Sequence, residues 1–97
     1  FFIWTVLGMK IKIELFGAAR DFSDQDYLEL TLPELSSIKE VRKNLIDFIE
    51  AKYPENKNYL EIIKRSAFAN EHNEIVQEQY QLSAHSKLCI IPPVGGG

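Results

Sequence analysis

The chemistry that this sequence can offer lies at its C-terminal end, in a tail made of Pro92, Pro93, Val94, Gly95, Gly96 and Gly97. Glycine loses more conformational freedom on ordering than any other residue, so a glycine run adds nothing to a folded core. The two prolines fix φ and favour an extended, stiff spacer ahead of the glycines. Such a tail could thread a channel too narrow for side chains and present a terminal carboxylate there.

The carboxylate of Gly97 is the group with a use in such a channel. A carboxylate is a poor electrophile at neutral pH and becomes useful only after activation, for example as an acyl-adenylate. Attack of sulfur on that adenylate would give a thiocarboxylate, a soft nucleophile that can donate its sulfur. The lack of bulk at glycine would help a partner enzyme to reach the carbonyl. The alternative interpretation is a tail without a function.

The rest of the sequence offers no complete active site. Cys89 is the only cysteine and lies in an apolar run, where burial raises the pKa of a thiol and leaves it inert. His72 and His85 fall in predicted loops and lack the spacing of a metal site. The sequence has no Ser-His-Asp set, phosphate loop or zinc signature. We therefore expect no metal and no cofactor bound to the chain, and a chemistry that a partner protein completes.

Composition predicts one small globular domain. The chain has 97 residues, of which 45% are hydrophobic and 26% charged, enough to bury a core of its own. The formal net charge is −3, and the scattered Lys and Arg lack the clustered basic face of a nucleic-acid-binding protein. A single cysteine cannot form an internal disulfide, so the fold does not depend on an oxidising compartment. We expect a cytoplasmic protein that binds no nucleic acid.

The opening stretch, residues 1–8, is apolar but too short for a transmembrane helix, which needs roughly 20 apolar residues. It also lacks the basic region and the cleavage site of a signal peptide. A sequence that reads as a complete domain begins at Met9. We therefore expect residues 1–8 to be an extension outside the fold, and no membrane association. The alternative is an apolar arm that packs on a neighbouring protein.

Hydrophobic periodicity predicts the elements that must hold the tail. Apolar and charged residues alternate over residues 9–15, and Leu28, Leu30 and Leu32 recur at every second position over 27–32, as in two antiparallel strands that each bury one face. A polar loop joins them. A helix of about 15 residues with one apolar stripe follows. It begins at a capping box of Ser37 and Glu40, and Pro54 closes it.

The second half of the sequence completes a mixed sheet. We expect a turn and a short helical piece over residues 56–63 and two short strands over 66–77. Residues 87–93 are an apolar run typical of a strand covered on both faces. The order predicts an α+β fold, the β-grasp or ubiquitin-like arrangement, with one main helix across the sheet and the last strand central and parallel to the first. We assign residues 9–91 to this domain and 92–97 to its extended tail.

Three stretches of the sequence have the pattern of a known family. "KIKIELFGAARD" is similar to a first strand that ends in an aromatic, followed by a small-residue loop and an Arg-acidic pair, here Phe16, Arg20 and Asp21. "AFANEHNEI" is similar to a hairpin with an Asn at the strand end, here Asn70. "LCIIPPVGGG" matches an ending of Pro-Pro-Val, one small residue and Gly-Gly. Over residues 9–97 the sequence resembles the small subunits of molybdopterin synthase, the MoaD-type sulfur carriers of the ThiS/MoaD ubiquitin-like family.

The resemblance implies a division of labour. An E1-like enzyme would adenylate Gly97 with ATP, and the end would become a thiocarboxylate. The large subunit of the synthase would take the tail into its active site and add sulfur to a pterin precursor of the molybdenum cofactor. The chain would be a non-catalytic sulfur-donor subunit, two copies of which lie at opposite ends of a large-subunit dimer. The docking surface would include apolar sheet residues near the tail, with Phe16, Arg20 and Ile91 at the interface.

Three alternatives stay open at this point. The chain could carry sulfur for thiamine or cysteine synthesis, although such carriers usually lack the Pro-Pro-Val spacer. It could be a ubiquitin-like modifier joined to lysines through Gly97, or a binding module with an idle tail. The turn before the last strand departs from the family, which usually has acidic residues and glycine there. This sequence has Ala84, His85, Ser86 and Lys87 instead.

Overall fold

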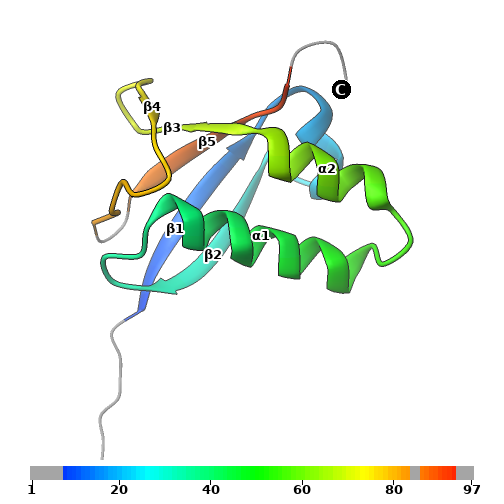
Figure 1. The fold of residues 1–97 in the computed structure, drawn as a ribbon, viewed down its shortest axis with the longest axis horizontal. Coiled ribbons are helices and arrows are strands. Elements are labelled where there is room, and N and C mark those ends of the chain that lie inside the picture. Colours follow the sequence, from blue (N-terminus) through cyan, green and yellow to red (C-terminus); the bar gives the residue numbers. More distant parts are fainter. Residues whose placement is uncertain (1–7, 84–85, 94–97) are drawn as a thin grey trace, which may run out of the picture.

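A computed structural model of the protein describes residues 8–83 and 86–93. Its elements follow in the order β1 (Gly8–Leu15), η1 (Gly17–Phe22, a 3₁₀ helix), β2 (Tyr27–Pro33), α1 (Ile38–Lys52), α2 (Lys57–Arg65), β3 (Ala67–Ala69), β4 (Ile75–Val76) and β5 (Lys87–Ile91). Both α-helices lie on the same side of the sheet, with α1 across it (Figure 1). The predicted β-grasp fold is confirmed.

The five strands form one sheet in the order β2-β1-β5-β3-β4. β5 lies in the middle, parallel to β1 on one edge and antiparallel to β3 on the other. A parallel neighbour needs a crossover connection rather than a tight turn, and the chain between β2 and β5, with both helices, supplies it. The expected central position of the last strand is therefore confirmed.

Helix α1 begins where the sequence predicts. The Glu40 N–H donates to Ser37 Oγ, and the Ser37 N–H donates to the Glu40 carboxylate at 2.9 Å, which completes a capping box. The helix ends at Lys52, so Pro54 follows its C-cap residue Tyr53. One face of the helix packs on the sheet through Ile38, Val41, Leu45 and Ile49.

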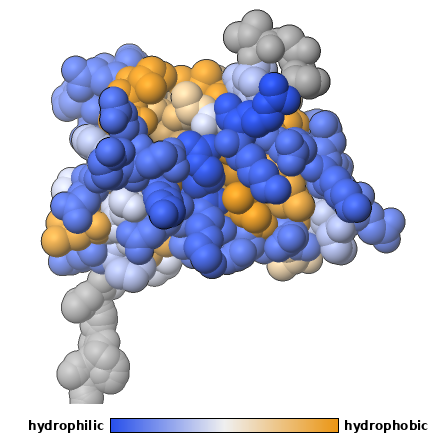
Figure 2. Space-filling view, in the orientation of Figure 1, coloured by the Kyte–Doolittle hydropathy of each residue, from blue (hydrophilic) through white to orange (hydrophobic). Residues whose placement is uncertain are grey.

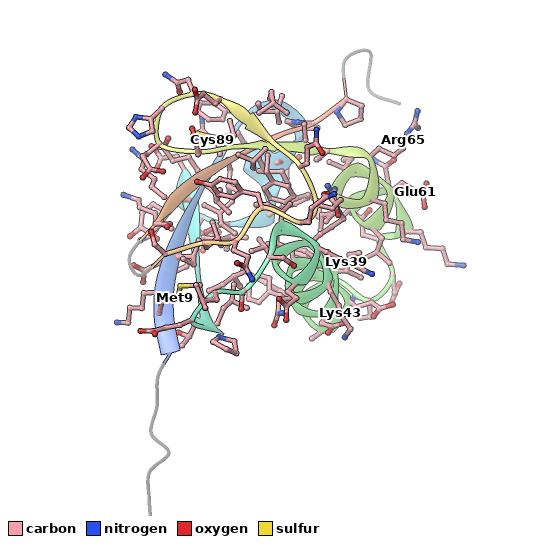
Figure 3. The ribbon with its side chains drawn as sticks, turned by 60° about the vertical axis from the view of Figure 1, so that its left-hand side comes forward. Met9, Lys39, Lys43, Glu61, Arg65 and Cys89 are labelled. Atoms are coloured by element: carbon pink, nitrogen blue, oxygen red, sulfur yellow. The ribbon has the colours of Figure 1, made fainter. Side chains whose placement is uncertain are left out.

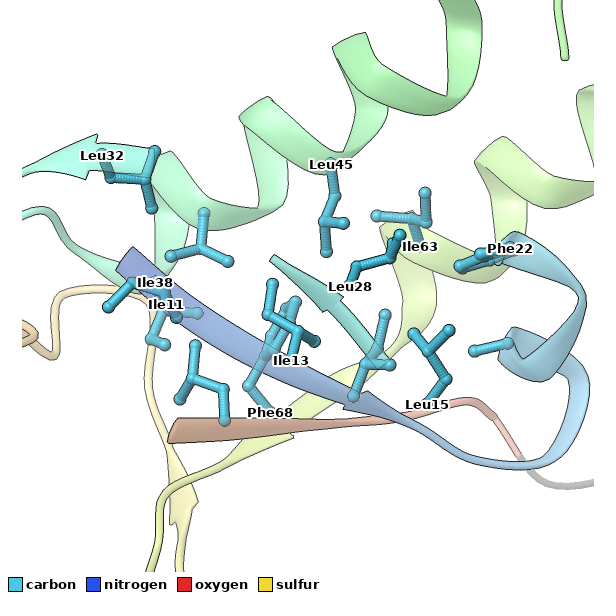
Figure 4. Packing of buried hydrophobic residues seen from close by; sticks show 14 of the residues in the cluster. Ile11, Ile13, Leu15, Phe22, Leu28, Leu32, Ile38, Leu45, Ile63 and Phe68 are labelled. Carbon is cyan, nitrogen blue, oxygen red and sulfur yellow. The ribbon is translucent and has the colours of Figure 1, made fainter. Parts of the chain in front are cut away.

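The core fills the space between the helices and the sheet (Figure 4). Each alternate residue of β1 points into it, and Ile11, Ile13 and Leu15 are almost completely buried. Leu45 of α1 joins them from the helix layer, and Phe68 joins them from β3, on the far side of β5. Burial of one such side chain stabilises the fold by about 1.5–3 kcal/mol. The core therefore holds β5 in place between its two neighbours.

The turn between β3 and β4 depends on Asn70, which is buried. Its side-chain oxygen accepts hydrogen bonds from the backbone N–H groups of His72 and Glu74, at 2.9 and 3.0 Å. Asn73 has a φ of 62°, a left-handed conformation that asparagine tolerates better than most residues. The predicted pair of short strands around this turn is confirmed.

The connection between β1 and β2 differs from the expected polar loop. It contains η1, and two of its residues, Ala19 and Phe22, are fully buried. The centroid of the Phe22 ring lies 5.2 Å from that of Tyr59 on α2. The prediction of a polar loop is wrong here because the contact of Phe22 with the distant Tyr59, which orders the segment, cannot be inferred from the local pattern of polar residues.

The strand β5 is covered on one face only. Leu88 and Ile90 are buried, whereas Lys87 and Ile91 are exposed and Cys89 is half-buried. The prediction of a strand covered on both faces is therefore wrong, because both helices lie on one side of the sheet. Burial in the helix-covered core consequently does not explain the apolar character of Cys89 and Ile91.

The first strand begins one residue earlier than predicted. Gly8 pairs with Pro33 at the end of β2, so this residue belongs to the fold and not to an extension. The rest of the expected extension, residues 1–7, lies outside the described residues. Within residues 8–83 and 86–93, no helix is long and apolar enough to cross a membrane.

Candidate functional site

The tail leaves the domain from the middle of the sheet. Ile90 pairs with Leu15 of β1, and Ile91 pairs with Ala67 of β3, so β5 is held on both edges as far as Ile90 and on the β3 edge to its last residue. Pro92 and Pro93 follow directly and are half-buried. Figure 1 shows this exit beside η1. Two prolines after a doubly paired strand fix the direction of exit.

A close approach of η1 supports the exit. Gly17, the first residue of η1, has a φ of 54°, and a Cβ added there would lie 3.7 Å from Cγ of Pro92. The left-handed conformation favours glycine because it has no Cβ. Gly17 thus lets the chain turn out of β1 and places η1 against the first residue of the tail. The remaining tail residues, Val94, Gly95, Gly96 and Gly97, lie outside the described residues.

An apolar surface lies beside the exit, on the face of the sheet away from the helices, which we call the outer face. Phe16 at the end of β1 is 49% exposed, Ile91 is 38% exposed and Ile75 of β4 is 62% exposed. Strand pairing places Ile75 opposite Ala69, and Ala69 opposite Cys89, so these residues follow one another across the sheet. We call Phe16, Ala69, Ile75, Cys89 and Ile91 the apolar patch.

A shallow pocket of about 290 Å³ opens within this patch. Its lining consists of Glu14, Phe16, Ala69, Asn73, Cys89 and Ile91. In the view of Figure 2 hydrophilic residues dominate, and apolar areas lie between them. An exposed apolar surface around a pocket is typical of a site that binds another protein.

Glu14 links the patch to a charged neighbour. Its carboxylate accepts a hydrogen bond from the Cys89 thiol at 3.4 Å and lies 3.1 Å from Nζ of Lys87. The hydrogen bond from Lys87, helped by that from Cys89, lowers the pKa of Glu14 below its ordinary value. Burial, and then the hydrogen bond to Glu14, raises the pKa of Cys89. The thiol is thus protonated at neutral pH, although it lies on the outer face and not in the core.

The residues predicted for the partner interface fall in two places. Phe16 and Ile91 line the same pocket, although 75 positions separate them in the sequence. Arg20 is exposed on η1 and is not among the residues that line the pocket. The structure therefore brings Phe16 and Ile91 together and leaves Arg20 at some remove from the pocket.

Sequence reasoning missed four of the lining residues, Glu14, Ala69, Asn73 and Cys89, and also Ile75 beside them. The signal for two of these was present in the hairpin motif: if Asn70 begins the turn, Ala69 and Ile75 pair across it and point to the same face. Among the described residues, no group of three His, Cys, Asp or Glu side chains could hold a metal ion. His72 is exposed, and His85 lies outside the described residues.

Similar proteins share this fold. The structure of a putative molybdopterin converting factor subunit 1 from Pyrococcus furiosus is 18% identical, with a TM-score of 0.65 over 89% of this chain and 99% of that chain. Small archaeal modifier protein 1 from Methanosarcina acetivorans is 20% identical, with a TM-score of 0.61 over 93% and 98%. A complex of subunits 1 and 2 of molybdopterin-converting factor from Helicobacter pylori contains a chain that is 19% identical, with a TM-score of 0.54 over 92% and 100%.

At this level of identity the solved structures show the fold alone. No curated protein sequence matches the chain. The model of the ThiS family, however, matches residues 13–97, which include β1 from Ile13 onward and every later element together with the tail. The chain therefore belongs to the ThiS family.

Proposed function

We propose that this protein is the sulfur carrier subunit of a molybdopterin synthase and that Gly97 is the residue it uses. The observation behind this proposal is the position of β5, which leads the Pro-Pro-Val-Gly-Gly-Gly tail out of the centre of the sheet beside an exposed apolar patch. Membership of the ThiS family and the fold shared with molybdopterin converting factor subunits support it.

The chemistry begins at the Gly97 carboxylate. An E1-like enzyme joins this carboxylate to the α-phosphorus of ATP and releases pyrophosphate. A hydrosulfide-level sulfur donor then attacks the acyl carbon, the bond from that carbon to the adenylate oxygen breaks, AMP leaves with this oxygen, and the terminus becomes a thiocarboxylate without oxidation or reduction. The chain itself binds neither ATP nor a metal in this scheme. Its own contribution is a terminus without side chains, which follows a strand paired in the centre of the sheet and two prolines.

The sulfur is used in the large subunit of the synthase. The apolar patch, with Phe16 and Ile91 around its pocket, docks on that subunit while the tail enters its active site and donates sulfur to the pterin precursor. One structural relative is a complex of subunits 1 and 2 of molybdopterin-converting factor, which supports a partner of this kind. We propose that two copies of the chain bind a large-subunit dimer in the cytoplasm.

A second candidate is a protein modifier, because the fold also matches a small archaeal modifier protein. In that case Gly97 forms an isopeptide bond with lysines of other proteins. Both functions use the same activated terminus, so the fold does not separate them. A carrier for thiamine or cysteine synthesis fits less well, because the Pro-Pro-Val spacer precedes the glycines.

Deletion of Gly96 and Gly97 tests the proposal in cells that depend on this chain for molybdenum cofactor. We expect loss of the cofactor while the purified variant keeps the melting temperature of the wild type, since neither glycine has a side chain to contribute to a core. Cofactor formation at the wild-type level would overturn the proposal. A search for isopeptide-linked Gly97 on lysines of cell proteins distinguishes the modifier function.

A further inference from the structure

The outer face of the sheet has a second zone beyond the apolar patch. Lys10 and Lys12 alternate with the buried residues of β1, so both point away from the helices, and both are exposed. Lys87, at the start of β5, is exposed on the same face. In the parallel pairing of β1 with β5, Lys12 is the direct partner of Lys87. We call Lys10, Lys12 and Lys87 the lysine row.

The pairing of Lys12 with Lys87 does not favour folding. Like charges directly opposite each other on neighbouring strands are destabilising. The charge of Lys87 is matched by Glu14 at 3.1 Å. Nζ of Lys12 instead lies 4.3 Å from the centroid of the Tyr27 ring, a cation–π contact that orients the ammonium group without neutralising it. Lys10 lies opposite Thr31 and Lys12 opposite Glu29 of β2, and neither lysine forms an ion pair among the described residues. Lys10 above all therefore remains available to an external anionic group.

The helix side has a different charge pattern. Lys43 pairs with Asp47, and Lys64 pairs with Glu61, each within one helix. Figure 3 shows Lys39 and Lys43 of α1 on the side of the molecule away from Cys89. The whole chain has a formal net charge of −3, yet the strand residues of the outer face carry three lysines against the carboxylates of Glu14 and Glu29. These strand residues therefore carry one net positive charge, opposite in sign to the protein as a whole.

We propose that the lysine row binds an acidic surface of the protein that receives the tail, with Asp or Glu carboxylates of that partner opposite Lys10 and Lys12. This inference deepens the proposed function and rests on it, because it describes the partner of the same face. Lys10 and Phe16 are six positions apart on β1 and its end, or about 20 Å at the rise of a strand. The acidic contacts consequently lie at the far end of the interface from the point where the tail leaves.

Such an arrangement gives the two zones different roles. The apolar patch is desolvated on docking and determines the dissociation rate of the complex. Charges at the rim of an interface act mainly on the association rate and on its salt dependence. The lysine row therefore orients the chain during encounter so that the tail meets the entrance of the partner's channel.

The test measures association and dissociation with the large subunit of the molybdopterin synthase of the same organism by stopped-flow fluorescence. The test variant is Lys10→Glu with Lys12→Glu, and the matched control is Lys43→Glu with Lys64→Glu, which changes the net charge equally. At low salt we expect the association rate constant of the test variant to fall about tenfold and its dissociation rate to change less than about twofold. We expect the control to keep the association rate within about twofold, and the difference to shrink at high salt.

Three outcomes would overturn the inference. An unchanged association rate in the test variant would show that the row contacts no acidic surface. An equal loss in test and control variants would show an effect of net charge alone. If the wild-type chain does not bind the large subunit at all, the proposed function fails together with this inference. If the wild type binds, Ile91→Asp abolishes that binding and the lysine variants do not change it, only this inference fails. If the glutamate variant melts below the assay temperature, Lys10→Gln with Lys12→Gln replaces it, with an expected loss of about threefold.

Discussion

Arg42 of α1 connects three parts of the chain that flank the central strand, so its replacement tests how the site is held in place. Its Nη1 donates to the backbone oxygens of Ile63 and Ser66, at 2.7 and 2.8 Å, which caps the C-terminal end of α2. Its Nε and Nη2 donate to the carboxylate of Glu78. The guanidinium carbon also lies 5.1 Å from the centroid of the Phe68 ring on β3.

The change Arg42→Met keeps most of the aliphatic stem and removes the donors. Hydrogen bonds from a charged donor contribute about 1.5–3 kcal/mol each, and an acceptor left without a partner in the interior costs about 1–3 kcal/mol. The Glu78 pair adds at most about 1 kcal/mol, because its carboxylate is 49% exposed and water screens the attraction. These effects overlap, so we expect the free energy of unfolding to fall by about 3 kcal/mol. For a domain of this size that corresponds to about 15 °C in melting temperature.

Urea unfolding followed by circular dichroism measures this change. Lys43→Met, one position along the same helix, is the matched control, because the ammonium group of Lys43 makes only an exposed pair with Asp47. We expect the control to lose less than about 0.5 kcal/mol. A loss below about 1 kcal/mol for Arg42→Met would refute the idea that Arg42 secures the end of α2 and the start of β3.

Three further predictions concern the exit of the tail and the charged groups. Gly17→Ala should destabilise the domain by about 1–2 kcal/mol, because a Cβ at a φ of 54° is strained, and an unchanged urea midpoint would contradict this. The hydrogen bond from Arg42 lowers the pKa of Glu78, so the stabilisation is present above the ordinary glutamate pKa and is lost as the pH falls through the lower value of the folded state. Urea midpoints between about pH 6 and pH 3 should consequently fall less in Glu78→Gln than in the wild type; parallel curves would refute this. The raised pKa of Cys89 predicts that its thiol reacts slowly with a thiol reagent at pH 7.5, and more slowly still when a partner covers the patch. The thiol should react faster in Glu14→Gln, because the hydrogen bond to Glu14 is lost. Faster labelling of the wild type than of Glu14→Gln would contradict a role of Glu14 in raising this pKa.

Much of the fold follows from local pattern. Alternation over β1 shows which face of that strand is buried, and Ser37 with Glu40 marks the first turn of α1. Both signals are local, because a strand repeats every second residue and a capping box spans four residues. The place of β5 also follows, since a β-grasp order leaves the last strand beside the first.

The features that local pattern misses depend on contacts between distant residues. The run Leu88-Cys89-Ile90-Ile91 is uniformly apolar and therefore does not show that one of its faces is left open by the helices. The contact of Arg42 with Glu78 joins residues 36 positions apart and is not visible as a spacing. The order of η1 depends on Phe22 meeting Tyr59 of α2.

Some residues of the candidate site could likewise be predicted from the sequence, and others could not. The tail can be recognised in the sequence from its composition, prolines followed by glycines, and its proposed use rests on that composition. Phe16 and Ile91 were predicted at the interface from family resemblance, and the structure brings them to one pocket. Ala69, Ile75 and the lysine row needed the register of the strands, since only pairing shows which residues share a face.

Transfer of sulfur through Gly97 is tested most directly by the mass of the C-terminal peptide of the chain purified from cells that make molybdenum cofactor. We expect this peptide, and no other, to gain the mass difference between sulfur and oxygen. Oxidation of Cys89 or Met9 adds nearly the same mass, so the shift must be assigned to the fragment that ends at Gly97. A C-terminal peptide that stays unmodified when ATP, the E1-like enzyme and a sulfur donor are all supplied would contradict transfer of sulfur through Gly97.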